Sequence, residues 1–142
     1  MALVLGVVVM AGWASETRVR MNDLPEAVRK TVQEQTQNAR VKGFSKEVEN
    51  GKTYYEAETI VNGKSRDILI DSGGAVVEVE QEMAIENVPA AVRKTIETRA
   101  APGKIKKVES VTKGSTVSYE AVIFRNGKDS EIAVNADGAT IK

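Results

Sequence analysis

The stretch Leu24-Pro25-Glu26-Ala27-Val28-Arg29-Lys30-Thr31-Val32 returns 64 residues later as Val88-Pro89-Ala90-Ala91-Val92-Arg93-Lys94-Thr95-Ile96. Two shorter stretches return at the same spacing: Tyr55-Glu56-Ala57 as Tyr119-Glu120-Ala121, and Asn62-Gly63-Lys64 as Asn126-Gly127-Lys128. Residues 24–78 and 88–142 align without a gap and are identical at 16 of 55 positions. The chain is therefore a tandem repeat, and one structural explanation has to serve both copies.

Each repeat opens with a predicted helix. Pro25 and Pro89 suit the first helical position, because the N–H that proline lacks has no partner there in any helix. Val28 and Val32 are four residues apart in the first copy, as are their counterparts in the second copy. This spacing predicts a narrow apolar stripe that one face of the helix buries.

Beyond each helix the apolar period changes from 3.6 to 2 residues, which predicts strands. Asn62-Gly63 and Asn126-Gly127 predict type I′ hairpin turns, because both residue types tolerate a positive φ. The predicted strands are 41–49, 52–61, 65–71 and 75–81 in the first copy, and 105–113, 116–125, 129–135 and 139–142 in the second. We therefore predict an α+β fold with two tandem repeats, residues 21–82 and 83–142, each a helix packed on a four-stranded antiparallel meander.

The composition excludes several classes of function. The chain of 142 residues has 20 basic and 20 acidic side chains, so it lacks the strong positive charge of a nucleic-acid-binding domain. It has no histidine and no cysteine, which excludes histidine bases, thiolate nucleophiles, His- or Cys-ligated metals and disulfides. We predict a protein that is not an enzyme and that has no cofactor, no metal site and no nucleic-acid partner. A hydrolase that works with carboxylates alone remains as an alternative.

Residues 1–15 have the pattern of a signal peptide. An apolar run over residues 2–11 ends in Gly12-Trp13-Ala14-Ser15, and it is too short for the ~20 residues that span a bilayer. No lysine or arginine precedes the run, so the n-region is short; the alternative is a buried N-terminal strand. The pattern predicts a periplasmic or secreted protein with no stable membrane span after cleavage.

The repeat unit resembles a known family. The leading Leu24-Pro25-x-x-Val28 helix, the Tyr55-Glu56-Ala57 strand, the glycine turn and the closing strand that follows an Asp/Gly-rich turn resemble the PepSY-like group, which includes the β-lactamase-inhibitor-like domains of secreted bacterial proteins. This resemblance covers both repeats. It implies an exported bacterial protein with a helix-on-sheet fold and a binding or inhibitory role. The known inhibitor of this architecture has a sheet rich in aromatic contacts, whereas aromatic residues make up only 4% of this chain. Inhibition of a β-lactamase is therefore not carried over.

The candidate binding residues are carboxylates on one side of the predicted sheet. Alternation along a strand places Tyr55 and Ala57 on one face and Glu56 on the other. Residues 46–82 carry nine acidic and four basic side chains, which favours a face for a cationic segment of a partner. The alternative is a solvated sheet face that binds nothing. The candidate partner-binding residues are Glu56, Glu58, Asp67, Glu78, Glu80 and Glu120.

From these observations we predict an exported, non-catalytic protein-binding module with an unidentified protein partner in the cell envelope. Inhibition of an envelope or secreted hydrolase is one form that this binding could take. The alternative function is a periplasmic carrier that holds a small ligand or a divalent cation on its acidic sheet face.

Overall fold

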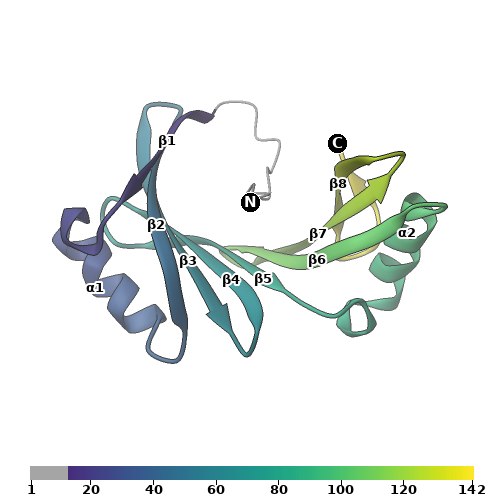
Figure 1. Cartoon of the computed structure of the whole chain (residues 1–142), viewed down its shortest axis with the longest axis horizontal. Helices are drawn as coiled ribbons and strands as arrows, with labels where there is room; N and C mark the ends of the chain where they lie inside the picture. The colour runs from purple at the N-terminus through teal and green to yellow at the C-terminus, as the bar shows by residue number, and fades with distance from the viewer. Residues whose placement is uncertain (1–12) are drawn as a thin grey trace. The chain divides into compact units, whose positions relative to one another are not determined.

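The computed structural model describes residues 13–142 (Figure 1). The strands are β1 (Trp13–Val19), β2 (Arg40–Glu49), β3 (Lys52–Val61), β4 (Lys64–Asp71), β5 (Val76–Glu82), β6 (Lys104–Lys113), β7 (Thr116–Arg125), β8 (Lys128–Asn135) and β9 (Thr140–Ile141). The helices are α1 (Glu26–Gln35) and α2 (Ala90–Ala100), and a short 3₁₀ helix precedes each of them at Met21–Asp23 and Ile85–Asn87. Most of the predicted signal peptide, residues 1–12, lies outside the described residues.

The predicted fold class is wrong in the way it groups the strands. The strands form a nine-stranded antiparallel sheet in the order β1 to β9, and not two separate four-stranded meanders. The prediction assigns residues 13–15 to the signal peptide and therefore has no strand ahead of α1, where the structure has β1. The edge of a sheet presents unpaired N–H and C=O groups to which a further strand can add. A sheet therefore need not end where a sequence repeat ends.

The individual strands were predicted well. For the eight strands β2 to β9, the predicted and observed bounds differ by no more than one residue at either end. The φ angles of Asn62 and Gly63 are 50° and 79°, and those of Asn126 and Gly127 are 52° and 74°. Positive φ at both central residues is the geometry of a type I′ turn, so these two turn predictions are confirmed.

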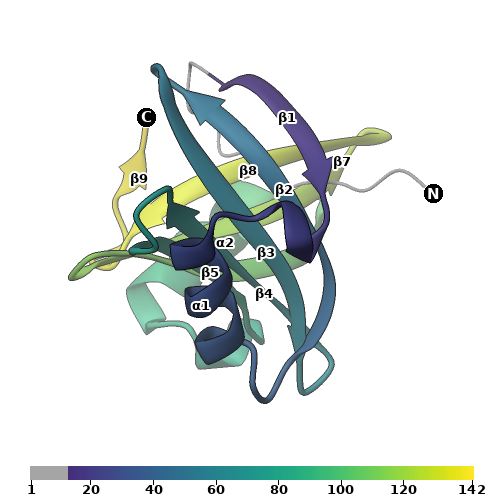
Figure 2. The same cartoon turned by 90° about the vertical axis from the view of Figure 1, so that its left-hand side faces the viewer.

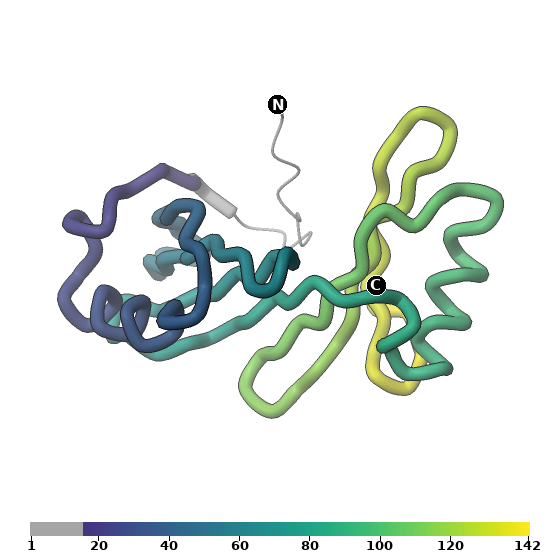
Figure 3. Tube along the Cα trace, turned by 60° about the horizontal axis from the view of Figure 1, so that its bottom comes forward, coloured from purple at the N-terminus to yellow at the C-terminus, as the bar shows by residue number. Residues whose placement is uncertain are grey.

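The chain divides into two compact units between Gln81 and Glu82. We call the described residues 13–81 the first unit and residues 82–142 the second unit, and each is described by itself. Figure 3 follows the Cα trace, in which a helix is succeeded by consecutive antiparallel strands in both units.

Each unit buries one face of its helix against its own strands. In Figure 2, α1 lies across the strands of the first unit. The core of that unit consists of Leu24, Val28, Val32, Ala57, Ile68 and Ile70, all nearly inaccessible to solvent. The core of the second unit consists of Val88, Val92, Ile96, Val108, Ala121 and Val134. The helix stripe predicted from the four-residue spacing therefore contacts alternate residues of the strands, which is how a helix and a sheet share one apolar layer.

A glycine and a threonine fix each helix to the turn before the last strand of its repeat. Thr31 Oγ1 donates a hydrogen bond to the carbonyl oxygen of Gly74 at 2.5 Å, and Thr95 Oγ1 donates to that of Gly138 at 2.6 Å. Both glycines have φ near +90°, and a Cβ at Gly74 would lie 2.7 Å from the carbonyl oxygen of Ala27. These positions of the repeat are therefore occupied by glycine for two reasons, the backbone conformation and the close approach of the helix.

Within residues 13–142, neither helix is long and apolar enough to cross a membrane.

Candidate functional site

The strand register of the first unit gathers carboxylates on the sheet face opposite α1. Ala57 and Ile68 are paired and belong to the core, so their neighbours along β3 and β4 point the other way. On that other face Glu58 of β3 lies opposite Asp67 of β4, and Asp67 lies opposite Glu80 of β5 in the strand register. We call this surface the acidic face; its carboxylates are Glu16, Glu47, Glu49, Glu56, Glu58, Asp67, Glu78 and Glu80.

The structure thus brings five of the six candidate binding residues together on one surface, and Glu120 lies in the second unit. Their surroundings differ from the solvated row that the sequence suggests. Glu58 is only 4% exposed, and Glu56, Asp67, Glu78 and Glu80 are half-buried. Whether these residues bind a partner stays a prediction.

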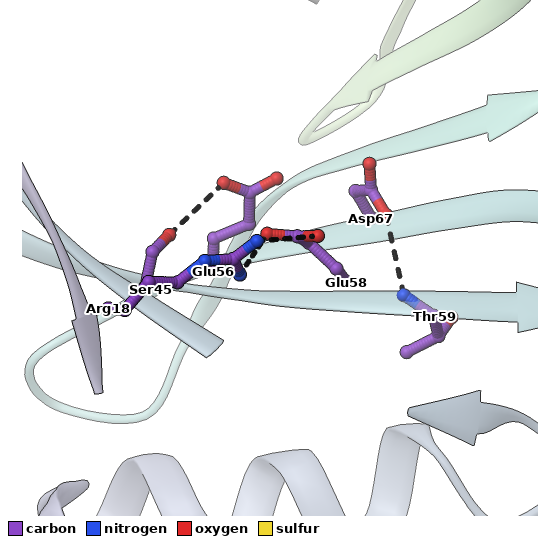
Figure 4. A network of polar contacts seen from close by, with 6 residues as sticks. All are labelled: Arg18, Ser45, Glu56, Glu58, Thr59 and Asp67. Carbon is purple, nitrogen blue, oxygen red and sulfur yellow. Dashed lines mark hydrogen bonds and ion pairs between the residues drawn. The ribbon is translucent and has the colours of Figure 1, made fainter. Parts of the chain in front are cut away.

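Glu58 forms an ion pair with Arg18, which reaches it from β1 across β2. The guanidinium donates two hydrogen bonds to the Glu58 carboxylate, and Nη2 lies 3.4 Å from Oε2 (Figure 4). The residue of β2 that lies opposite Glu58 is Gly43, and a Cβ there would stand 3.0 Å from Arg18 Nη1. The hydrogen bond and the charge of Glu58 raise the pKa of Arg18. A buried carboxylate is costly unless a cation compensates it, and Gly43 leaves the space that lets Arg18 do so.

Glu47 and Glu56 form a second pair, which shares a proton. Glu47 is 5% exposed and Glu56 is half-buried, and their carboxyl groups are hydrogen-bonded to each other. Burial, followed by the hydrogen bond with Glu47, raises the pKa of Glu56 to about 9, and burial raises that of Glu47 to about 7. Two neighbouring carboxyl groups in a poorly solvated place cannot both ionise cheaply. Glu56 therefore holds the proton at neutral pH and donates it to Glu47.

Hydrogen-bond donors are scarce around this pair. Ser45, which is fully buried, donates from Oγ to Glu56 Oε2 over 3.4 Å, a long contact (Figure 4). Glu47 Oε2 is buried and has no hydrogen-bond partner among the described residues. Most buried polar atoms in proteins have a partner, so this oxygen is an exception that calls for an explanation.

Sequence reasoning missed Arg18, Ser45 and Glu47. Arg18 follows the predicted cleavage site closely and was not expected in the sheet. Alternation alone could not place residues of β2, because a register shift between Val41 and Gly43 changes which residues share a face. The contact between Arg18 and Glu58 can therefore be identified only when the strand register is known.

The second unit has its own carboxylate network on the corresponding face. Glu109 on β6 lies opposite Glu120 on β7 in the strand register, and the two residues are 4% and 7% exposed. The ammonium group of Lys107 lies 2.5 Å from Glu109 Oε1. Burial raises the pKa of Glu131, and a hydrogen bond with Glu120 opposes this increase. Here a lysine of the chain itself supplies the positive charge.

No metal cluster accompanies these carboxylates within the described residues, and an open depression of the first unit lies elsewhere. Among residues 13–142, no group of three or more acidic side chains is placed so that it could hold a metal ion. An open depression of about 550 Å³ in the first unit lies beside the two hairpin turns rather than at the carboxyl pair; it is lined by Lys52, Thr53, Tyr54, Asp71, Ser72, Gly73 and Val77. Asp71 Oδ1 accepts the N–H groups of Gly73 and Ala75, so this carboxylate holds the turn together.

Comparisons with known proteins identify the fold. No family model matches the chain, and no curated protein matches it. A "putative periplasmic protein" from Bacteroides eggerthii is 16% identical with a TM-score of 0.69, and the match covers 84% of this chain and 86% of that one. A DUF2874 family protein from Bacteroides ovatus is 15% identical with a TM-score of 0.66, covering 84% and 85%. A BLIP-like protein from Bacteroides fragilis is 18% identical with a TM-score of 0.62, covering 84% of each chain. The chain therefore has the fold of DUF2874 family and BLIP-like proteins, and its likeness to the PepSY-like group stays a prediction.

Proposed function

We propose that this chain is an exported, non-catalytic binding module whose acidic face receives a cationic segment of a protein partner in the cell envelope. The observation that carries the proposal is the charge of that face. Its carboxylates come from all five strands of the first unit. Among its basic residues, Arg18 is paired with Glu58, and Arg40 and Lys52 lie at strand ends. A surface with one sign of charge attracts and orients a partner of the opposite sign.

An exported location is supported by two separate observations. The apolar run of residues 2–11, followed by small residues, has the pattern of a secretory signal. The neighbour from Bacteroides eggerthii carries a periplasmic name. A periplasmic or secreted protein would meet its partner in the cell envelope.

A binding role fits the site better than a catalytic one. Carboxylate-based hydrolysis needs two carboxyl groups that flank a space for substrate. Glu47 and Glu56 are instead hydrogen-bonded to each other, and the depression of the first unit is lined by other residues. The name of the Bacteroides fragilis neighbour connects this fold with inhibitor-like proteins, so the partner could be an envelope or secreted hydrolase that the chain inhibits.

Charge reversal on β5 tests the proposal. We would immobilise the protein and its Glu78→Lys/Glu80→Lys variant, and compare what each captures from the envelope fraction of the source organism. The matched control is Glu26→Lys/Glu34→Lys, which makes the same change in charge on the exposed side of α1. We expect at least a tenfold loss of the captured partner with the β5 variant and none with the control. Equal capture by all three proteins would sink the proposal. A captured hydrolase would then be assayed with and without the chain.

The carrier alternative has its own test, since the same face could attract divalent cations. Thermal unfolding would be followed with calcium, magnesium or manganese. A ligand bound only by the folded state stabilises it by ~2.7 kcal/mol at a hundredfold excess over the dissociation constant. A rise in Tm of that order with one metal would favour the carrier function over the protein-binding one.

A further inference from the structure

The Glu47–Glu56 pair is a carboxyl pair that forms no ion pair with a cation among residues 13–142. Its two side chains come from neighbouring strands, and Ser45 is the donor that contacts Glu56. The strongest charged neighbours of the pair are carboxylates: Glu16 from β1, Glu49 from β2, Glu58 from β3, Asp67 from β4 and Glu78 from β5. The guanidinium of Arg18 also acts on Glu56 through its charge, but its hydrogen bonds go to Glu58. Arg40, which lies opposite Ile60 on the same face, is exposed at one end of β2.

The buried oxygen of Glu47 indicates what is missing. Among residues 13–142, Glu47 Oε2 is an acceptor without a donor, and an unsatisfied buried acceptor costs about 1–3 kcal/mol. A proton between the two carboxyl groups satisfies one oxygen of Glu47 and leaves this second one unmet. A group with several donors and a positive charge would satisfy both.

The second unit has a lysine ammonium on the corresponding face of its sheet. The alignment of the two repeats puts Glu120 at the position of Glu56 and Lys107 at the position of Gly43. In the second unit the Lys107 ammonium lies against Glu109, and Glu109 is paired with Glu120. This sheet face therefore accommodates a lysine ammonium among buried carboxyl groups. The first unit has glycine at that position, and its own sequence supplies no lysine to the pair.

Resting on the function proposed above, we propose that Glu47 and Glu56 form an anchoring site for one lysine side chain of the partner's cationic segment. The ammonium takes the place of the shared proton: Glu56 releases that proton to water, and both carboxylates then accept hydrogen bonds from the ammonium. No covalent bond forms or breaks apart from the O–H bond of Glu56. An ammonium suits the site because its three donors are close together, whereas guanidinium is a broad planar fork. Divalent metals fit less well, because the described residues contain no three-ligand cluster.

The exchange makes binding depend on pH. The pair has to lose its proton before it can hold the ammonium, and the raised pKa values mean that this loss is costly at acid pH. Affinity should therefore increase as pH rises from about 6 toward 9, the range in which the pair titrates while a lysine stays charged.

The test uses n-butylammonium chloride as a stand-in for a lysine side chain. The side-chain carboxyl carbons of the intact protein would be titrated by NMR, with Glu47→Gln and Glu56→Gln used to identify the two signals. We expect saturating butylammonium to lower the titration midpoint of the pair by about 1–3 pH units, the usual effect of a nearby opposite charge. Tetramethylammonium chloride at the same concentration is the control, because it has the charge and no N–H donor. An unchanged midpoint, or the same change with both salts, would overturn the proposal.

Partner capture separates this inference from the function on which it rests. Glu47→Gln/Glu56→Gln should lose at least tenfold in capture, and the variant's fold would be checked by circular dichroism. If this variant captures the partner normally while Glu78→Lys/Glu80→Lys does not, the lysine site is wrong and the binding function stands. If the unaltered protein captures nothing but butylammonium still lowers the midpoint, the binding function is wrong and the ammonium site stands.

Discussion

The two units bury carboxylates on the same side of the same kind of sheet, and they compensate them differently. In the first unit, Glu58 on β3 is paired with Arg18, which comes from β1. In the second unit, Glu109 on β6 is paired with Lys107 from its own strand. The alignment matches Glu109 with Ser45 and Val122 with Glu58. The acid and its cation therefore both lie on β6, the counterpart of β2, in the second unit, whereas in the first unit they lie on the two strands that flank β2. Each copy of the repeat therefore has a buried carboxylate paired with a cation, but the two copies use residues at different positions.

Among the described residues each unit buries two carboxylates, at different positions of the repeat: Glu47 and Glu58 in the first, and Glu109 and Glu120 in the second. Glu47 of the first unit aligns with Val111, an apolar core residue of the second. In addition to its Arg18–Glu58 ion pair, the first unit contains the Glu47–Glu56 carboxyl pair, on which Arg18 acts only through its charge. The copies thus differ on the face opposite the helix, and also over residues 33–41, which share no identical residue with 97–105, while residues 27–31 of the helix and the Asn62-Gly63 turn are unchanged.

The largest difference we expect between the units concerns their cores. Ile68 is fully buried in the first unit, whereas its counterpart Ile132 is half-buried in the second. Removing a buried isoleucine leaves a cavity, so Ile68→Ala should cost about 2–5 kcal/mol of the free energy of unfolding. Ile132→Ala should cost clearly less. Hydrogen exchange of core amides, followed separately in each unit, would measure both costs. Equal losses would show that the two cores are packed alike despite the difference in exposure.

The helix-to-turn contact should give the next largest effect, and here the units should agree. Ala at Gly74 would combine a positive φ with a contact of 2.7 Å to Ala27, and Ala at Gly138 a contact of 2.9 Å to Ala91. We expect each substitution to destabilise its own unit by about 1–3 kcal/mol. Gly63→Ala is the control for backbone strain alone, since nothing lies within 4 Å of a Cβ there. If Gly63→Ala costs as much as Gly74→Ala, the approach of the helix contributes nothing.

Removing the cation of each ion pair should lower the free energy of unfolding of its unit by a smaller amount. Arg18→Met leaves Glu58 buried without its partner, at a cost of ~1–2 kcal/mol, the lower half of the range for an unsatisfied buried acceptor because Arg18 itself is half exposed. Lys107→Met should cost a similar amount in the second unit. Double-mutant cycles with Glu58→Gln and Glu109→Gln would isolate each pair. A coupling energy near zero in the first unit would mean that water replaces Arg18 readily.

The parts of this fold that depend on local chemistry were predictable from the sequence. The Val28–Val32 spacing, the Asn62-Gly63 turn and the alternation of β3 each encode their own geometry, so the helix, the hairpins and the strand bounds followed from them. Pro25 is the N-cap of α1 and not its first residue, so the prediction for this proline is wrong by one position. The grouping of strands did not follow, because β1 comes from a segment whose composition also suits a cleavage site. No local signal says whether a sheet continues past a repeat.

The candidate site was predictable in part for the same reason. The alternation of side chains along each strand predicts that Glu56, Glu58 and Asp67 lie on the face opposite the helix, and the strand register places them there. It could not show that Arg18 crosses β2 to reach Glu58, since that contact needs a glycine at position 43 and a register shift beside it. Nor could it reveal that Glu47 and Glu56 share a proton, because the burial that raises a carboxyl pKa is a property of the assembled sheet.

The two units should also differ in the pH dependence of their stability. The pKa of Glu56 is about 9 in the folded chain and that of Glu47 about 7, against an ordinary value of 4.5. A folded-state pKa above the unfolded one means that the folded state binds more protons. The stabilising contribution is therefore complete below about pH 4.5 and is lost as pH rises through 7 and then 9.

Glu56→Gln should remove most of this loss, so that the first unit of the variant keeps its stability between pH 6 and 9 where the unaltered unit weakens. The matched variant is Glu120→Gln in the second unit, where Lys107 supplies a cation to the carboxylate network, and it should change the pH slope less. Hydrogen exchange in each unit, corrected for the intrinsic pH dependence of the exchange rate, would measure both slopes. If the two variants reduce the pH dependence of their units equally, a lysine in a carboxyl network lowers that dependence no more than a shared proton does. The proposed difference between the two units would then be wrong.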